Sequence, residues 1–348
     1  LNAFTSYDAT AYIVSLPANR LELWTILESD RFKKPVLREF YTEVENVREE
    51  RRLSVEDNPG ALLYERLTAT AYDAHRYGVE IIGWDSEIRT INRSEVEDYY
   101  RRYYAPNQMI IAVSGDVDPA ETVAMIDAYF GDYDRQPPPH PVQTEEPEQL
   151  GEKRLEVEYD AEPRILMAWH KPTVGHPDNA ALTVARHILD NGLSSRFERN
   201  IVNKGIAASI SAGVDNPGER YPNLFTVSAT VQSPHTVADV ERAILFEMDR
   251  LKTEPVTAAE LEKAKTQIET AYVRSFGSNM RSAINIAYEE AVLGNWMRRP
   301  ESILACREVT AEDVQRVANT YFKKQTRTVG YTVKPEEEEL ESAMGGTR

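Results

Sequence analysis

The chain has 348 residues, enough for about two domains at roughly 100–200 residues each. Its 57 acidic and 40 basic side chains give a net charge of −17, which argues against nucleic acid or an anionic membrane surface as the main partner. The single cysteine, Cys306, excludes a disulfide framework and a cysteine-rich zinc module, and no apolar run approaches the roughly 18 residues of a membrane span.

The first half of the chain predicts an opening strand pair or long strand, then helices and one further strand. Segment 1–16 is rich in β-branched and aromatic residues that partly alternate with polar ones. The run Asp57-Asn58-Pro59-Gly60 predicts a break between two helices. We expect helices over 20–32, 37–54, 61–72, 92–104 and 119–129, and a buried strand over Met109–Val113.

A proline-rich acidic stretch, 135–150, predicts an extended linker between two domains. The first domain is then expected over 1–134 and the second over 151–335, with an acidic, frayed tail at 336–348. In the second half we expect strands at 164–169, 207–212, 223–231 and 326–333, and helices over 179–190, 237–251, 258–275, 280–293 and 309–322.

An internal repeat links the two halves of the chain. Moving the sequence along by 218 residues superimposes a helix, an aromatic pair and a strand: Ile91 on Val309, Val96 on Val314, Tyr103 on Tyr321, Tyr104 on Phe322 and Ile111 on Val329. The pattern predicts an α+β fold with two homologous domains, each a mostly antiparallel sheet covered by helices.

Two carboxylates on the expected helix 37–54 are candidates for chemistry. Glu43 and Glu50 are seven residues apart, which places them within about 20° of one another around a helix. They fit a solvated helix with ion pairs, or a metal ligand and its supporting carboxylate. The six histidines include no pair with the i, i+4 spacing of a helical zinc site, so the residues alone leave both interpretations open.

Other chemically distinctive side chains are expected to have packing roles. Cys306 lies on an expected helix without an evident base beside it, which predicts a packed thiol. Four tyrosines at helical spacing predict a packed aromatic face with hydroxyls at its edge: Tyr99, Tyr100, Tyr103 and Tyr104.

Taken together, several segments resemble the insulinase/pitrilysin family of zinc peptidases. The resemblance covers nearly the whole chain in order and is specific in combination. It is carried by Leu1–Tyr12, Val47–Pro59, Ile82–Trp84, Tyr103–Asn107, Val113–Asp116, Leu193–Arg196 and Val309–Val314.

The resemblance implies a zinc site to which Glu50 contributes one ligand and Glu43 a supporting carboxylate. In the family, an inverted motif, His-x-x-Glu-His, supplies two zinc ligands and the general base, about 75 residues before the third ligand. This sequence has no such motif. We therefore expect the motif upstream of Leu1, the first domain to be amino-terminally incomplete, and the chain as given to be inactive with zinc weak or absent. The alternative is a natural protein without the motif.

A second departure concerns residues that bind the substrate backbone. Family members carry an Arg and a Tyr seven apart in the second domain or in a partner, and the matching positions here are Ile201 and Ala208. Neither side chain can donate a hydrogen bond. This implies a zinc-bearing subunit whose homologous partner supplies the Arg/Tyr pair, or else a homodimer with a degraded site.

The family also binds peptide as an added strand at a sheet edge, and the matching positions are Asn2, Ala3, Phe4 and Thr5. The resulting expectation is a zinc-dependent endopeptidase subunit that cleaves peptides or unfolded segments in a closed chamber by way of zinc-activated water. The alternatives are a non-catalytic scaffold or partner subunit, and a processing subunit that prefers basic targeting presequences. A soluble protein of the bacterial periplasm or cytoplasm is expected, and one cysteine fits either compartment.

Overall fold

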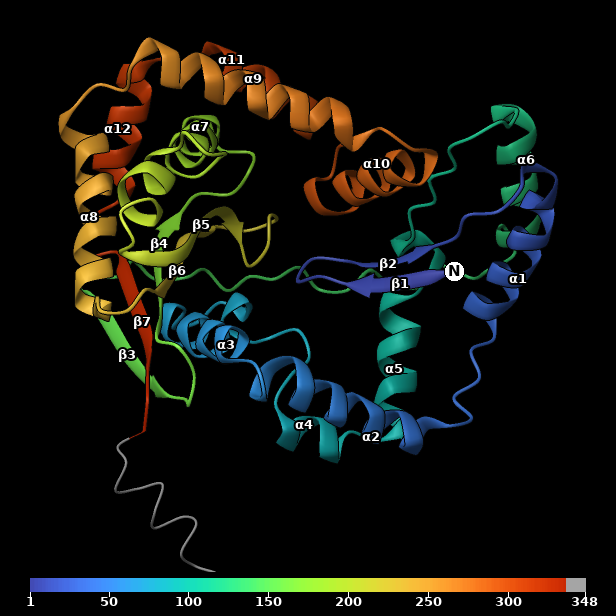
Figure 1. Ribbon diagram of the computed structural model, residues 1–348. Coiled ribbons are helices and arrows are strands. Elements are labelled where there is room, and N and C mark those ends of the chain that lie inside the picture. Colours follow the sequence, from blue (N-terminus) through green and yellow to red (C-terminus); the bar gives the residue numbers. More distant parts are fainter. Residues whose placement is uncertain (336–348) are drawn as a thin grey trace, which may run out of the picture. The chain divides into compact units, whose positions relative to one another are not determined.

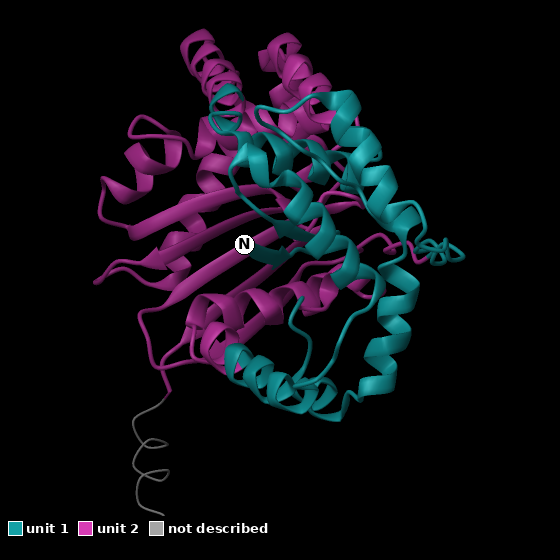
Figure 2. Ribbon diagram, turned by 90° about the vertical axis from the view of Figure 1, so that its right-hand side faces the viewer, with its two compact units in different colours: residues 1–51, 81–143, 273–297 teal, residues 52–80, 144–272, 298–348 magenta. Residues whose placement is uncertain are grey.

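The computed structural model describes residues 1–335 and has an α+β fold of helices and two sheets (Figure 1). The chain forms two compact units, each assembled from three segments (Figure 2). Unit 1 comprises Leu1–Arg51, Ile81–Gln143 and Val273–Met297, and unit 2 comprises Arg52–Glu80, Thr144–Tyr272 and the chain from Arg298 onward. The tail predicted at 336–348 lies outside the described residues. The predicted boundaries of the two homologous domains stay a prediction, because the two compact units are defined by contacts between residues and not by common origin.

Unit 1 contains a hairpin and several helices. Strand β1 (Asn2–Thr5) pairs antiparallel with β2 (Thr10–Ile13), so the opening segment is a strand pair. The helices are α1 (Leu21–Lys33), α2 (Phe40–Arg51), α4 (Asp85–Thr90), α5 (Arg93–Tyr103), α6 (Pro119–Phe130) and α10 (Asn279–Leu293). Asn92 caps α5 by accepting a hydrogen bond from the Glu95 amide at 3.0 Å, which satisfies one of the amides that a helix start leaves unpaired.

Aromatic rings join the hairpin of unit 1 to its helices. The rings of Tyr12 and Phe32 meet edge to face at 5.4 Å, and the Arg31 guanidinium lies 4.3 Å from the centre of the Tyr12 ring. The packed tyrosine face predicted for α5 is wrong in part, since Tyr99 is 57% and Tyr103 42% exposed. The rings of these two lie against one another on the solvent side of α5, four residues apart. The third tyrosine of α5, Tyr100, turns toward α1 and donates from its hydroxyl to the Phe32 carbonyl at 3.1 Å.

The strand predicted over Met109–Val113 is not formed. The segment has no regular structure, and Ile110 is 43% exposed. A strand needs a neighbour to take up its backbone hydrogen bonds, and among residues 1–335 neither sheet offers this segment one.

Unit 2 is built around a five-stranded sheet with the order β3-β7-β4-β6-β5. The β3–β7 pair is parallel and the other pairs are antiparallel, so the sheet is mixed. Its strands are β3 (Lys153–Glu158), β4 (Arg164–Lys171), β5 (Ala207–Asn216), β6 (Asn223–Val231) and β7 (Arg327–Val333). The sequence patterns identified all of these except β3.

Helices cover both faces of this sheet. Alternate residues of β4, namely Ile165, Met167 and Trp169, join a buried core with α7 (Asn179–Leu189), α8 (Val237–Thr253) and α12 (Ala311–Tyr321). Helix α3 (Pro59–Ala71) packs against β3, β4 and β7 from the other side, where Leu63 approaches Gly330 (Figure 1).

The remaining elements complete the connections. Helix α9 (Ala258–Ser275) follows α8, and α11 (Arg298–Glu308) carries Cys306. As predicted, that cysteine is buried, and its burial raises the pKa of the thiol to about 11. The short helical turns are η1 (Ala18–Arg20), η2 (Arg52–Glu56), η3 (Arg76–Gly78), η4 (Pro106–Gln108) and η5 (Glu198–Val202). Every helix within residues 1–335 is too short or too polar to cross a bilayer.

Candidate functional site

Helix α2 carries the two carboxylates that the sequence singled out, and arginines fix it within unit 1. Arg48 donates from Nε to Asp85 of α4 at 2.8 Å, and this hydrogen bond lowers the pKa of the Asp85 carboxyl. Arg51 is buried, donates from Nη1 to the Gly83 carbonyl at 2.6 Å and lies 5.4 Å from the centre of the Trp84 ring. One side of α2 is therefore held against the segment that leads into α4.

Glu43 and Glu50 lie away from these anchors. Both residues are exposed, and the amide of Asn46 donates to Glu43 at 3.2 Å. Within residues 1–335, no three His, Cys, Asp or Glu side chains are grouped so that they could hold a metal ion. The described residues therefore do not form a zinc site by themselves, and the roles of Glu50 and Glu43 stay predictions.

In unit 2, the buried His75 and the half-buried His170 have partners close by and are packed. Nδ1 of His75 accepts from the Tyr77 amide at 3.2 Å. Nε2 of His170 lies 3.0 Å from the Ala71 carbonyl, and burial lowers the pKa of this imidazole. Both belong to an aromatic cluster that includes Tyr72.

The predicted peptide-binding strand is exposed along its length. Residues Asn2, Ala3, Phe4 and Thr5 form β1, with Asn2 opposite Ile13 of β2. In the part of the chain that the structure describes, β1 pairs with β2 alone, so the opposite edge of β1 is free to add a strand. Its use by a peptide stays a prediction.

The positions matching the family's Arg and Tyr have different surroundings in unit 2. Ile201 lies in η5 and is fully buried in the core. Ala208 lies at the start of β5 and is exposed. Neither provides a side-chain donor.

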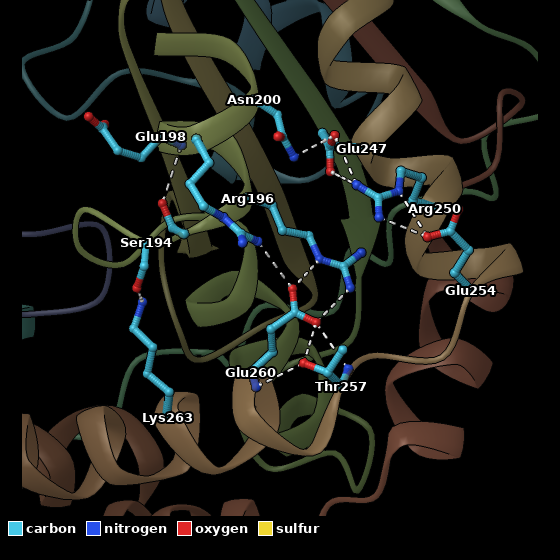
Figure 3. A network of polar contacts seen from close by, with 12 residues as sticks. Ser194, Arg196, Glu198, Asn200, Glu247, Arg250, Glu254, Thr257, Glu260 and Lys263 are labelled. Atoms are coloured by element: carbon cyan, nitrogen blue, oxygen red, sulfur yellow. Dashed lines mark hydrogen bonds and ion pairs between the residues drawn. The ribbon is translucent and has the colours of Figure 1, made fainter. Parts of the chain in front are cut away.

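A polar network that sequence reasoning missed fixes the segment leading to Ile201 (Figure 3). The buried Arg196 donates to Glu260 through Nε at 2.8 Å and Nη2 at 3.1 Å. Lys263 donates from Nζ to Ser194 at 2.7 Å. The start of α9 thereby holds both ends of the run Ser194-Ser195-Arg196.

Glu260 also caps its own helix. Its carboxylate accepts from the Thr257 amide at 3.0 Å, and the Thr257 hydroxyl accepts from the Glu260 amide at 3.2 Å. Partial burial by itself would raise the pKa of Glu260, but the hydrogen bonds from Arg196 and Thr257 outweigh it and lower this pKa to about 2. The spacing Thr-x-x-Glu in the sequence indicates this helix cap. No local sequence pattern indicates the contact between Glu260 and the distant Arg196.

Two family models match this chain, one after the other. The model described as "Insulinase (Peptidase family M16)" matches residues 1–84, and the one described as "Peptidase M16 inactive domain" matches residues 90–268. Together they span the hairpin, α2 and most of the sheet of unit 2.

Curated relatives match over most of their length. "Zinc protease PqqE" of Helicobacter pylori is 27% identical over 345 residues, covering 96% of this chain and 76% of that protein. "Probable mitochondrial-processing peptidase subunit beta" of Schizosaccharomyces pombe is 25% identical, covering 92% of this chain and 72% of that protein.

Among solved structures, "The crystal structure of a protease from Helicobacter pylori" has the same fold. Its TM-score is 0.88 at 23% identity, and the match covers 95% of this chain and 81% of that one.

Proposed function

This chain belongs to peptidase family M16, the insulinase family, and from that membership we propose that it is the zinc-bearing subunit of an endopeptidase that cleaves peptides or unfolded segments. The observation that supports this proposal most directly is the position of Glu50. It is exposed on α2, within the segment that matches the insulinase model and two helical turns after Glu43. The names of the bacterial relatives as zinc proteases support the same activity.

The residues of this chain do not provide enough ligands to hold a catalytic zinc ion. A catalytic zinc ion takes three protein ligands, and Glu50 would provide one. We propose that the inverted His-x-x-Glu-His motif of the family comes from residues outside this sequence. Because residues 1–335 group no three candidate ligands, we assign no catalytic step to them.

A partner subunit would complete substrate binding. Ile201 and Ala208 stand at the Arg and Tyr positions, so we propose that a homologous chain supplies the two donors. The S. pombe relative is named as a subunit, which supports a two-chain enzyme. The exposed β1 would take the peptide as an added strand. We also propose that the two halves of the chain arose by duplication.

A second candidate is a non-catalytic scaffold subunit that shapes the chamber. Ile201 and Ala208 favour the scaffold, because a chain that lacks the substrate-binding Arg and Tyr can also lack catalytic activity. Zinc binding by the natural full-length protein separates the two candidates, since a scaffold needs no metal.

The deciding experiment measures zinc content and cleavage of a fluorogenic peptide by the full-length protein and two variants. We expect about one zinc ion per chain. Glu50→Gln should weaken zinc binding by at least about 100-fold and abolish cleavage, because it removes a ligand. Glu45→Gln changes the same charge on the same helix and should retain both. A full-length protein without zinc would support the scaffold instead, whereas full zinc content in Glu50→Gln would overturn the assignment of Glu50 as a ligand.

A further inference from the structure

A groove on the sheet of unit 2 is lined by a mixture of polar and apolar residues from α3, β4, β5 and β6. It has a volume of about 480 Å³, which is in the range of small-ligand sites. Five hydroxyl side chains from β5 and β6 line its floor: Ser209, Ser211, Thr226, Ser228 and Thr230. Of the described residues that line the groove, Arg164 alone carries a charge.

Arg164 stands at one end of the groove without a partner for its charge. Its guanidinium forms no hydrogen bond or ion pair with any of residues 1–335, and its Nε is buried. The Nη1 atom lies 3.8 Å from the position that a Cβ on Gly60 would take, which places the guanidinium beside the first turn of α3. The start of a helix is itself electropositive, so two positive groups meet here.

The hydroxyls form rows that extend from Arg164 along the strands. Arg164 is opposite Thr230, which pairs with Ser209, and two residues further on Ser228 pairs with Ser211. Each pair shares one hydrogen bond, at 3.3 Å for Ser209–Thr230 and 2.8 Å for Ser211–Ser228. Every hydroxyl has two lone pairs and a proton, so each pair keeps hydrogen-bonding capacity for a ligand.

The spacing of these rows matches an extended peptide. Side chains on one face of a strand recur every two residues, or about 6.6 Å, and an extended ligand repeats its groups at the same interval. Tyr64 of α3 forms a wall, and its hydroxyl, which is protonated at neutral pH, can donate a hydrogen bond to a ligand.

We propose that this groove binds a short extended peptide by its free carboxyl terminus, with the carboxylate on Arg164 and the peptide backbone on the hydroxyl rows. A guanidinium pairs with a carboxylate through two parallel hydrogen bonds, and the neutral hydroxyls tolerate many sequences. The choice of a peptide rests on the proposed peptidase function, for which the groove would hold a substrate or a product.

The test is calorimetric titration of the full-length protein in the presence of a metal chelator, so that cleavage has no part in it. The ligands are a neutral N-acetylated tetrapeptide with a free carboxyl terminus, its carboxyl-terminal amide, and inorganic phosphate. We expect the free acid to bind roughly 10- to 100-fold more tightly than the amide, as for a charge-assisted hydrogen bond. Arg164→Gln should abolish that difference. Arg281→Gln, the same charge change at an exposed position on α10, should preserve it.

Two further measurements guard against trivial outcomes. Ser211→Ala leaves Arg164 in place and should weaken the acid and the amide equally, by a few-fold, which tests the groove if Arg164→Gln does not fold. The sequence continues after β7 with four glutamates, so a chain ending at Pro335 should show the same preference without their carboxylates.

Equal binding of acid and amide would overturn the proposal, as would a preference that survives Arg164→Gln. Binding of phosphate through Arg164 while the peptides do not bind would also overturn it, in favour of a free phosphate site. A negative result here leaves zinc binding and cleavage unaffected, and loss of zinc in Glu50→Gln leaves this groove unaffected.

Discussion

At Glu260 a single carboxylate joins two elements of unit 2. It caps α9 through Thr257 and accepts two hydrogen bonds from Arg196, whose side chain is 3% exposed. Replacing it would leave Arg196 as a buried charge without its counterion, which costs more than the net contribution of the pair. The segment that carries Ile201 therefore depends on one residue of another helix.

We expect Glu260→Gln to lower the free energy of unfolding at pH 7 by about 2–4 kcal/mol, measured by urea denaturation. Glu262→Gln, an exposed neighbour on α9, should cost less than about 0.5 kcal/mol. A loss as small as that for Glu260→Gln would show that the pair with Arg196 does not stabilise the fold.

The same carboxylate predicts a pH dependence of stability. The pKa of Glu260 is about 2 in the folded chain against an ordinary value of 4.5, so the unfolded chain binds its proton first as the pH falls. The stabilisation is complete above about pH 4.5 and is lost as the pH falls toward 2. The stability difference between the natural chain and Glu260→Gln should therefore shrink across this interval. A difference that stays constant from pH 5 to pH 2.5 would contradict the assignment.

Some side-chain roles could be predicted from the sequence and others could not. The spacing of Glu43 and Glu50 places them on one face of a helix, and α2 has that helix. The pattern Thr257-Ala-Ala-Glu260 indicates a capping box, which is present. The Arg196–Glu260 pair joins residues 64 positions apart, and no local pattern specifies which of many acidic side chains an arginine will meet.

At the scale of elements, two strand predictions failed in opposite directions for the same reason. Met109–Val113 is apolar throughout and forms no strand, whereas Lys153–Glu158 has only Leu155 and Val157 as apolar residues and forms β3. The difference lies in the neighbour, because β7 pairs with β3. Helices were predicted better, since their hydrogen bonds and caps are local.

The contact of α3 with the sheet gives a test at this scale. A Cβ on Gly330 of β7 would lie 3.1 Å from side-chain atoms of both Leu63 and Leu155. Gly330→Val should therefore lower the free energy of unfolding by about 1–3 kcal/mol through overpacking. Gly151→Val, where a Cβ meets no atom of the described chain within 4 Å, is the matched control. Equal stabilities of the two variants would show that α3 moves away at no cost.

At the scale of the whole molecule, the net charge of −17 predicts how substrates approach. If the proposed peptidase activity holds, kcat/KM for a peptide carrying several lysines should fall several-fold as salt rises from about 20 to 200 mM, because screening removes long-range attraction. A neutral peptide of equal length should change by less than about two-fold. A parallel fall for both peptides would exclude steering by charge and with it the preference for basic presequences.

The three-part make-up of unit 1 has a consequence for synthesis on the ribosome. Its last segment, Val273–Met297, follows more than two hundred residues after Arg51, the end of its first segment. At roughly 5–20 residues per second, the first segment waits on the order of tens of seconds for its final partner. Unit 1 therefore cannot be completed in chain order: α1 and α2 can pack on α6 and α4 once the second segment has been made, whereas β2 waits for its contact with α10.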